Sequence, residues 1–171
     1  MAEHIVSSFD EDLEQIDGLI RAMGERSSSM VETATRALLS SDVAQAQRVI
    51  SDDVTMDAHQ RDIDERAITL IAKRQPMAQD LRAVVGAIRM ASDLERIGDL
   101  AKNIAKHVSA VGEGTTPRGL SHSIEAMARM VMIQVAAVVE HYEARDAEAL
   151  SALRVDDEKI DIQYTAVFRE L

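Results

Sequence analysis

The stretch FDEDLEQIDGLIRAMGERSSSMVETATRA, residues 9–37, decides the fold class of this chain. Its apolar and small residues recur in steps of three and four, which places side chains on one face of an α-helix. We therefore predict a helix of about 33 residues with the seam of a helical bundle along one side. This row consists of Phe9, Leu13, Ile16, Ile20, Met23, Ser27, Met30, Ala34 and Ala37.

The rest of the 171-residue chain has the same helical character. It contains only two prolines and seven glycines, and its long stretches are rich in strong helix formers. No run alternates apolar and polar residues as a half-buried strand does. Asp42 is placed to cap a helix, and Pro76 is suited to the first position of the next one. We expect helices of about 33, 32, 35, 25 and 25 residues, separated by breaks at 40–42, 74–77, 111–119 and 145–146.

Composition excludes several classes of protein. With 19 Lys and Arg against 30 Asp and Glu, the net charge of −11 repels nucleic acid. The absence of cysteine excludes disulfides, thiolate metal sites and cysteine nucleophiles. No apolar run approaches the roughly 20 residues of a membrane span, and the N-terminus does not resemble a secretory signal. The composition predicts a cytoplasmic protein with no membrane span.

A shift of 104 residues brings two parts of the chain into register. It places Asp42 on Asp146, and the seam of the first helix recurs as Leu120, Ile124, Met127, Val131, Gln134, Val138 and His141. We interpret this as a duplicated three-helix unit. The predicted fold is all-α, with tandem three-helix bundles at 1–111 and 118–171, the second lacking its last helix. On this interpretation the chain is part of a longer protein or a truncated variant.

Two acidic pairs are expected to face each other across the hairpin around Pro76. In an antiparallel hairpin, residues at the same height have numbers with a constant sum, here about 152. This pairs Asp57 with Glu95 and Asp53 with Asp99, and near the turn it pairs apolar residues, including those at positions 81 and 85 of the third helix. The carboxylates are expected at the bundle surface, because the third helix has a second apolar face roughly opposite them.

Four like charges between helices packed about 8–10 Å apart need compensation. They could share a proton, bind a hard cation through oxygen, or be neutralised by Arg61, Arg96 or Lys102. The simpler interpretation is a solvated acidic face. A ferritin-like di-iron oxidase is excluded, because it needs Glu three residues before His and none of the five histidines has it: His4, His59, His107, His122 and His141.

Two segments resemble the signature of the PhoU family, PMAQDLR at 76–82 and DLERIGD at 93–99. The duplicated three-helix architecture also resembles that of this family. The resemblance implies metal ligands on D/E-x-x-x-D motifs, with iron or zinc clusters. Hard-ion alternatives are manganese and magnesium. The matching residues are Asp53, Asp57, Glu95, Asp99, Asp157 and Asp161. The family's fourth motif has no counterpart here, which leaves Asp157 and Asp161 without a facing pair.

The resemblance also implies a function. Family members restrain the phosphate-starvation response and link the phosphate ABC transporter, through its ATPase, to a sensor histidine kinase, without enzymatic activity. The alternative is a metal-free helical scaffold with an acidic partner-binding face. We expect a homodimer or other homo-oligomer, because the second unit would expose Ile160, Tyr164, Val167, Phe168 and Leu171.

Overall fold

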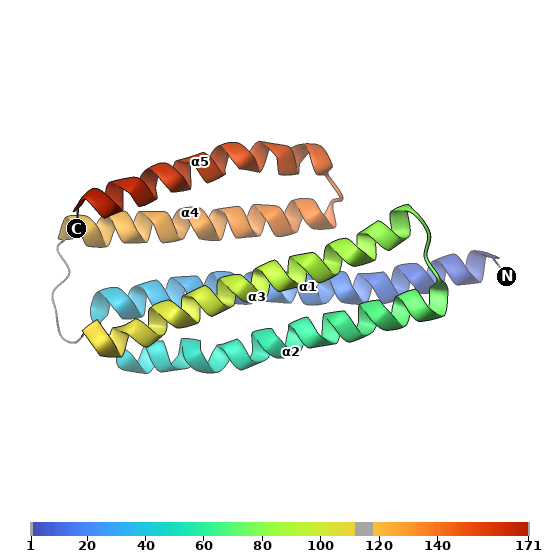
Figure 1. Ribbon diagram of the computed structural model, residues 1–171, viewed down its shortest axis with the longest axis horizontal. Coiled ribbons are helices and arrows are strands. Elements are labelled where there is room, and N and C mark those ends of the chain that lie inside the picture. The colour runs from blue at the N-terminus through green and yellow to red at the C-terminus, as the bar shows by residue number, and fades with distance from the viewer. Residues whose placement is uncertain (1, 112–117, 171) are drawn as a thin grey trace.

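Five helices make up residues 2–111 and 118–170, the part of the chain that the computed structural model describes (Figure 1). No strand occurs in this part, which confirms the all-α prediction. The first helix begins earlier than expected, whereas the later lengths agree closely with the prediction. The helices are α1 (Ala2–Ser40), α2 (Val43–Arg74), α3 (Gln79–Val111), α4 (Arg118–Glu143) and α5 (Ala147–Glu170).

Helix starts follow the prediction at Asp42 and depart from it at Pro76. The Asp42 side chain accepts a hydrogen bond from the Gln45 backbone N–H at 3.0 Å, and Asp146 caps α5 in the same way. Pro76 does not open α3, which begins three residues later. Gln75 (φ 49°) and Ala78 (φ 48°), on either side of the proline, have left-handed backbone conformations. The chain therefore reverses direction between α2 and α3 over the whole segment 75–78.

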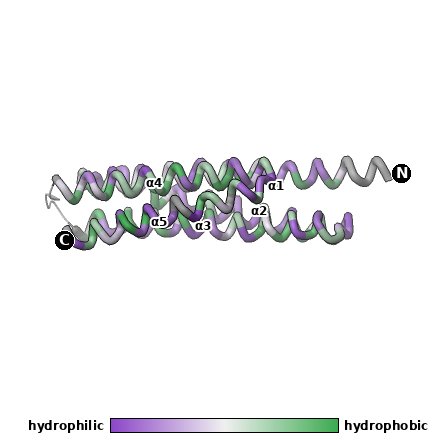
Figure 2. The backbone as a smooth tube through the Cα atoms, turned by 90° about the horizontal axis from the view of Figure 1, so that it is seen from above, coloured by the Kyte–Doolittle hydropathy of each residue, from purple (hydrophilic) through white to green (hydrophobic). Residues whose placement is uncertain are grey.

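Helices α1, α2 and α3 pack against one another in a three-helix bundle. Every member of the predicted α1 row is buried, including Ile16, Ile20 and Met23 with no exposed surface. Methionines and small aliphatic residues fill the core in place of aromatic ones. Figure 2 shows hydrophobic and hydrophilic segments alternating along the helices, as this packing requires.

The predicted inner row of α3 is wrong near the turn. Leu81 and Val85 remain 38 % and 37 % exposed, whereas Val84 is fully buried. The helix is rotated so that small side chains meet both α1 and α2 at close range, and the predicted row lies at the edge of this face. The buried row is Val84, Ala87, Ala91, Leu94, Ala101, Ala105 and Val108.

Helix α4 runs antiparallel to α1, and α5 contacts α4 alone among the described helices (Figure 1). The predicted α4 seam is confirmed at Leu120, which is buried, but further along the helix it is wrong, because Val135 and Val139 are the buried residues there. Val131, Gln134 and Val138 are only half-buried, because they border an open groove between α3 and α4.

Helices α1 and α4 approach each other closely. Gly24 of α1 faces Val139 of α4, so closely that an added Cβ would lie 2.6 Å from a Val139 methyl carbon. Further along the same two helices, Thr35 and Ala128 line one groove.

Within the described residues, one stretch, Gly119–Glu143 in α4, has the length and composition of a membrane-crossing helix. The sequence analysis did not identify this stretch, because it found no apolar run of that length. A helix that packs in a bundle can have the same length and composition. In this structure, Met132, Val135 and Val139 pack towards α1.

Candidate functional site

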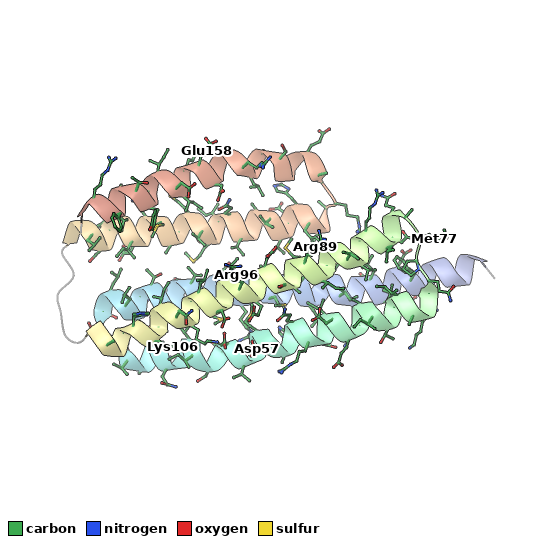
Figure 3. All side chains as sticks on the ribbon, viewed as in Figure 1. Asp57, Met77, Arg89, Arg96, Lys106 and Glu158 are labelled. Atoms are coloured by element: carbon green, nitrogen blue, oxygen red, sulfur yellow. The ribbon has the colours of Figure 1, made fainter. Side chains whose placement is uncertain are left out.

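The first carboxylate cluster lies on the facing sides of α2 and α3. Asp53 and Asp57 come from α2, and Glu95 and Asp99 come from α3. Gly98 brings the two helices close together here, because a Cβ at this position would lie 3.3 Å from Met56 Cγ. Figure 3 labels Asp57 on α2, and Arg96 and Lys106 on α3.

Lys102 lies between the two helices and contacts a carboxylate from each. Its ammonium donates to Asp53 Oδ2 and to Asp99 Oδ1, both at 2.5 Å. The lysine side chain is only 20 % exposed. Lys102 therefore takes the neutralising role for which the sequence offered three candidates. The close approach of Gly98 to Met56 gives a hairpin sum of 154, near the predicted value of about 152.

Asp53 is buried, which departs from the expectation that all the carboxylates lie at the surface. Its side chain is 8 % exposed, against 45 % for that of Asp99. The Oδ1 atom of Asp53 has no hydrogen-bond partner in the structure. A buried carboxylate oxygen without a partner is costly, so the site still lacks a donor or cation at this atom.

Electrostatics shows that the four acidic residues share one environment. Burial raises the pKa of Glu95, and the charges of Asp99, Asp57 and Asp53 raise it further, whereas Lys102 opposes them. The hydrogen bonds to Asp53 and Asp99 raise the pKa of Lys102, so this residue stays an ammonium. The cluster thus holds four acidic groups and one permanent cation.

The donor set is chemically suited to a hard cation, because all its potential ligands are carboxylate oxygens. The unpartnered Oδ1 of Asp53 fits such an ion. In the present side-chain arrangement, however, no three Asp, Glu or His side chains among the described residues converge on one metal position. Asp53, Asp57, Glu95 and Asp99 would therefore hold a metal only after their side chains rearrange.

The second acidic pair does not join the first. Asp157 and Asp161 are exposed on α5, and α5 makes no contact with α2 or α3 in the described part of the chain. The structure thus places four of the six predicted site residues together and keeps the other two apart.

Sequence analysis missed the polar contacts that attach α4 to α1. The Tyr142 hydroxyl donates to Asp17 at 2.7 Å, and Arg21 pairs with Glu143. Burial and the hydrogen bond to Asp17 raise the pKa of Tyr142, so the phenol stays protonated. The antiparallel register between α1 and α4, which brings these groups together, is set by tertiary packing and has no local sequence signal.

Comparison of the sequence with known proteins finds a matching protein family. A family model described as the PhoU domain matches residues 20–108. The phosphate-specific transport system accessory protein PhoU homolog of Rhizobium meliloti is 48 % identical over 168 residues, covering 98 % of this chain and 71 % of the relative. The homolog of the same name from Caulobacter vibrioides is 37 % identical over 171 residues, covering 100 % of this chain and 74 % of the relative.

Solved structures agree with the family match. The crystal structure of PhoU from Pseudomonas aeruginosa superposes with a TM-score of 0.86 at 31 % identity, over 95 % of this chain and 78 % of that one. The phosphate transport system regulatory protein PhoU from Streptococcus pneumoniae gives 0.85 at 27 % identity, over 95 % and 76 %.

Proposed function

The chain belongs to the PhoU family, and we propose that it is a negative regulator of phosphate uptake and of the phosphate-starvation response. It couples the phosphate ABC transporter to its sensor histidine kinase. The observation that carries this proposal is similarity along almost the whole chain to proteins named as accessory to phosphate-specific transport.

The proposed action is protein–protein contact in the cytoplasm, without catalysis. Long helices with exposed faces offer extended surfaces to partners, and the net charge of −11 favours partners with basic patches. Exposed apolar side chains such as Tyr164 and Phe168 favour assembly with another copy of the chain. The partners are the transporter ATPase and the kinase.

We further propose that Asp53, Asp57, Glu95 and Asp99 bind metal, with Asp157 and Asp161 as a separate set. Iron or zinc is expected from the family resemblance, and manganese or magnesium from the all-oxygen donors. The unpartnered Asp53 Oδ1 supports this proposal. Bound metal would neutralise the cluster and hold α2 and α3 together.

A second candidate function is a metal-free adaptor. The observation that favours it is the bridge from Lys102 to Asp53 and Asp99, which already supplies a cation. The remaining carboxylates then form an acidic face for a basic partner. Metal analysis of protein purified without chelator separates the two candidates, because the adaptor contains no stoichiometric metal.

The regulatory role is tested by gene deletion and complementation. Deletion is expected to raise expression of a phosphate-regulated reporter in phosphate-rich medium, and the gene supplied in trans should restore repression. A reporter that is unchanged by the deletion in both rich and starved medium contradicts the proposal. This readout does not depend on whether the protein holds metal.

A further inference from the structure

Lys102 lies between Asp53 and Asp99 and supplies the positive charge that pairs with both. Its ammonium lies 2.5 Å from one oxygen of each. The two carboxylates come from different helices, so the lysine links α2 to α3 as a bridging cation would. Lysine carries its charge on a flexible four-carbon stem, which allows the ammonium to leave without any backbone movement.

One ammonium does not satisfy the cluster. Lys102 engages a single oxygen of Asp53, and the other, Oδ1, is buried without a partner. Glu95 lies in the same field as Asp53, Asp57 and Asp99. Four carboxylates and one monovalent cation leave an excess of negative charge, which a divalent ion at the same position would neutralise further.

We propose that Lys102 is a built-in competitor of divalent metal, and that its displacement from Asp53 and Asp99 sets the affinity of the cluster for the ion. The ammonium keeps its proton and turns out to solvent when metal binds. Both oxygens of Asp53 and the freed oxygen of Asp99 then become available as ligands. This inference rests on the proposed metal site and adds the residue that controls it.

The test compares Mn²⁺ binding to the wild type and to Lys102→Met. Methionine keeps an apolar stem of similar length and removes the charge. Isothermal titration at pH 7, without phosphate in the buffer, is expected to give at least tenfold tighter binding for Lys102→Met. Lys106→Met is the matched control, because Lys106 is exposed on the same helix. It removes one charge as well, and its affinity should stay within about threefold of the wild type.

A stability measurement keeps the test decisive if the variant is weakened. Metal-free Lys102→Met is expected to melt below the wild type, because four carboxylates lose their cation, and Mn²⁺ should restore the difference. Lys102→Gln gives a second uncharged variant for the same comparison.

Equal affinity of Lys102→Met and the wild type overturns the proposal, as does an equal gain in Lys106→Met. Absence of Mn²⁺ binding in all variants also overturns it, and with it the metal site. The regulatory role stands or falls separately on the reporter experiment.

Discussion

At Asp53, a carboxylate with one buried oxygen faces a lysine from the neighbouring helix. The pairing of Asp53 with Asp57, and of Glu95 with Asp99, could be predicted from helical spacing and the hairpin. The identity of the bridging cation could not be predicted. The hairpin register is known from the sequence only to within a few residues, and over that range Arg61, Arg96 and Lys102 could all reach the carboxylates. In the structure Lys102 bridges the two helices, and Asp53 is buried.

Replacing Asp53 by Ala should cost more stability than replacing Asp99 by Ala. Asp53 is buried and its loss leaves Lys102 half-paired, so we expect a decrease of about 1–3 kcal/mol in the free energy of unfolding. Asp99 is 45 % exposed, and its loss should cost less than about 1 kcal/mol. Urea unfolding at pH 7 measures both values. A larger loss in Asp99→Ala would show that the bridge depends mainly on the exposed partner.

Replacing Glu95 by Gln should stabilise the protein at neutral pH. The raised pKa of Glu95 means that the folded protein holds this proton more tightly than the unfolded chain. Stability therefore falls as the pH rises from the ordinary value of 4.5 through the raised one, and glutamine removes this loss. Urea unfolding between pH 3.5 and 7 should show an advantage for the variant that disappears at the acid end.

Glu158→Gln on exposed α5 is the control for that series. Its stability should follow the wild type at each pH. An advantage of Glu95→Gln that is constant over the whole pH range would exclude ionisation as its cause.

At the scale of helices, the number and approximate bounds of the elements follow from apolar periodicity and caps. The inner face of α1 was also predictable, because this helix has neighbours on several sides and its whole apolar row is buried. The faces of α3 and α4 were not predicted correctly. Both carry apolar residues over a wide arc, and tertiary packing decides which part of the arc is covered.

The crossing of α1 and α4 predicts opposite effects for two glycines of α1. At Gly24 an added Cβ meets Val139 at 2.6 Å, whereas at Gly18 nothing lies within 4 Å. Gly24→Ala should force the helices apart and cost about 1–3 kcal/mol, offset in part by helix propensity. Gly18→Ala should gain up to about 1 kcal/mol from propensity alone. Thermal and urea unfolding measure both changes. A Gly24→Ala variant that is more stable than the wild type would show that α1 and α4 can move apart at no cost in stability.

At the scale of the molecule, the second unit leaves apolar side chains uncovered. Tyr164 and Phe168 are 58 % and 68 % exposed, and their rings lie 6.4 Å apart. The sequence predicted this patch in part, but Val167 is buried and Leu171 lies outside the described residues. The difference arises because α5 turns Val167 towards α4, the one described helix that it contacts.

The 171-residue chain is expected to self-associate through this patch. Sedimentation should show a mass above that of the monomer at high concentration, and the double variant Tyr164→Glu, Phe168→Glu should shift it to monomer. Ile68→Lys, at an equally exposed apolar residue on α2, should leave the association unchanged. A wild type that sediments as a monomer at every concentration would contradict the expectation.

The close contact between α1 and α4 has a consequence for how the fold is kept together. Gly24 of α1 lies against Val139 of α4, and Thr35 and Ala128 line one groove between the same two helices. Because both helices belong to one polypeptide, each meets the other at an effective concentration of roughly millimolar. This contact therefore does not depend on how much protein a cell makes.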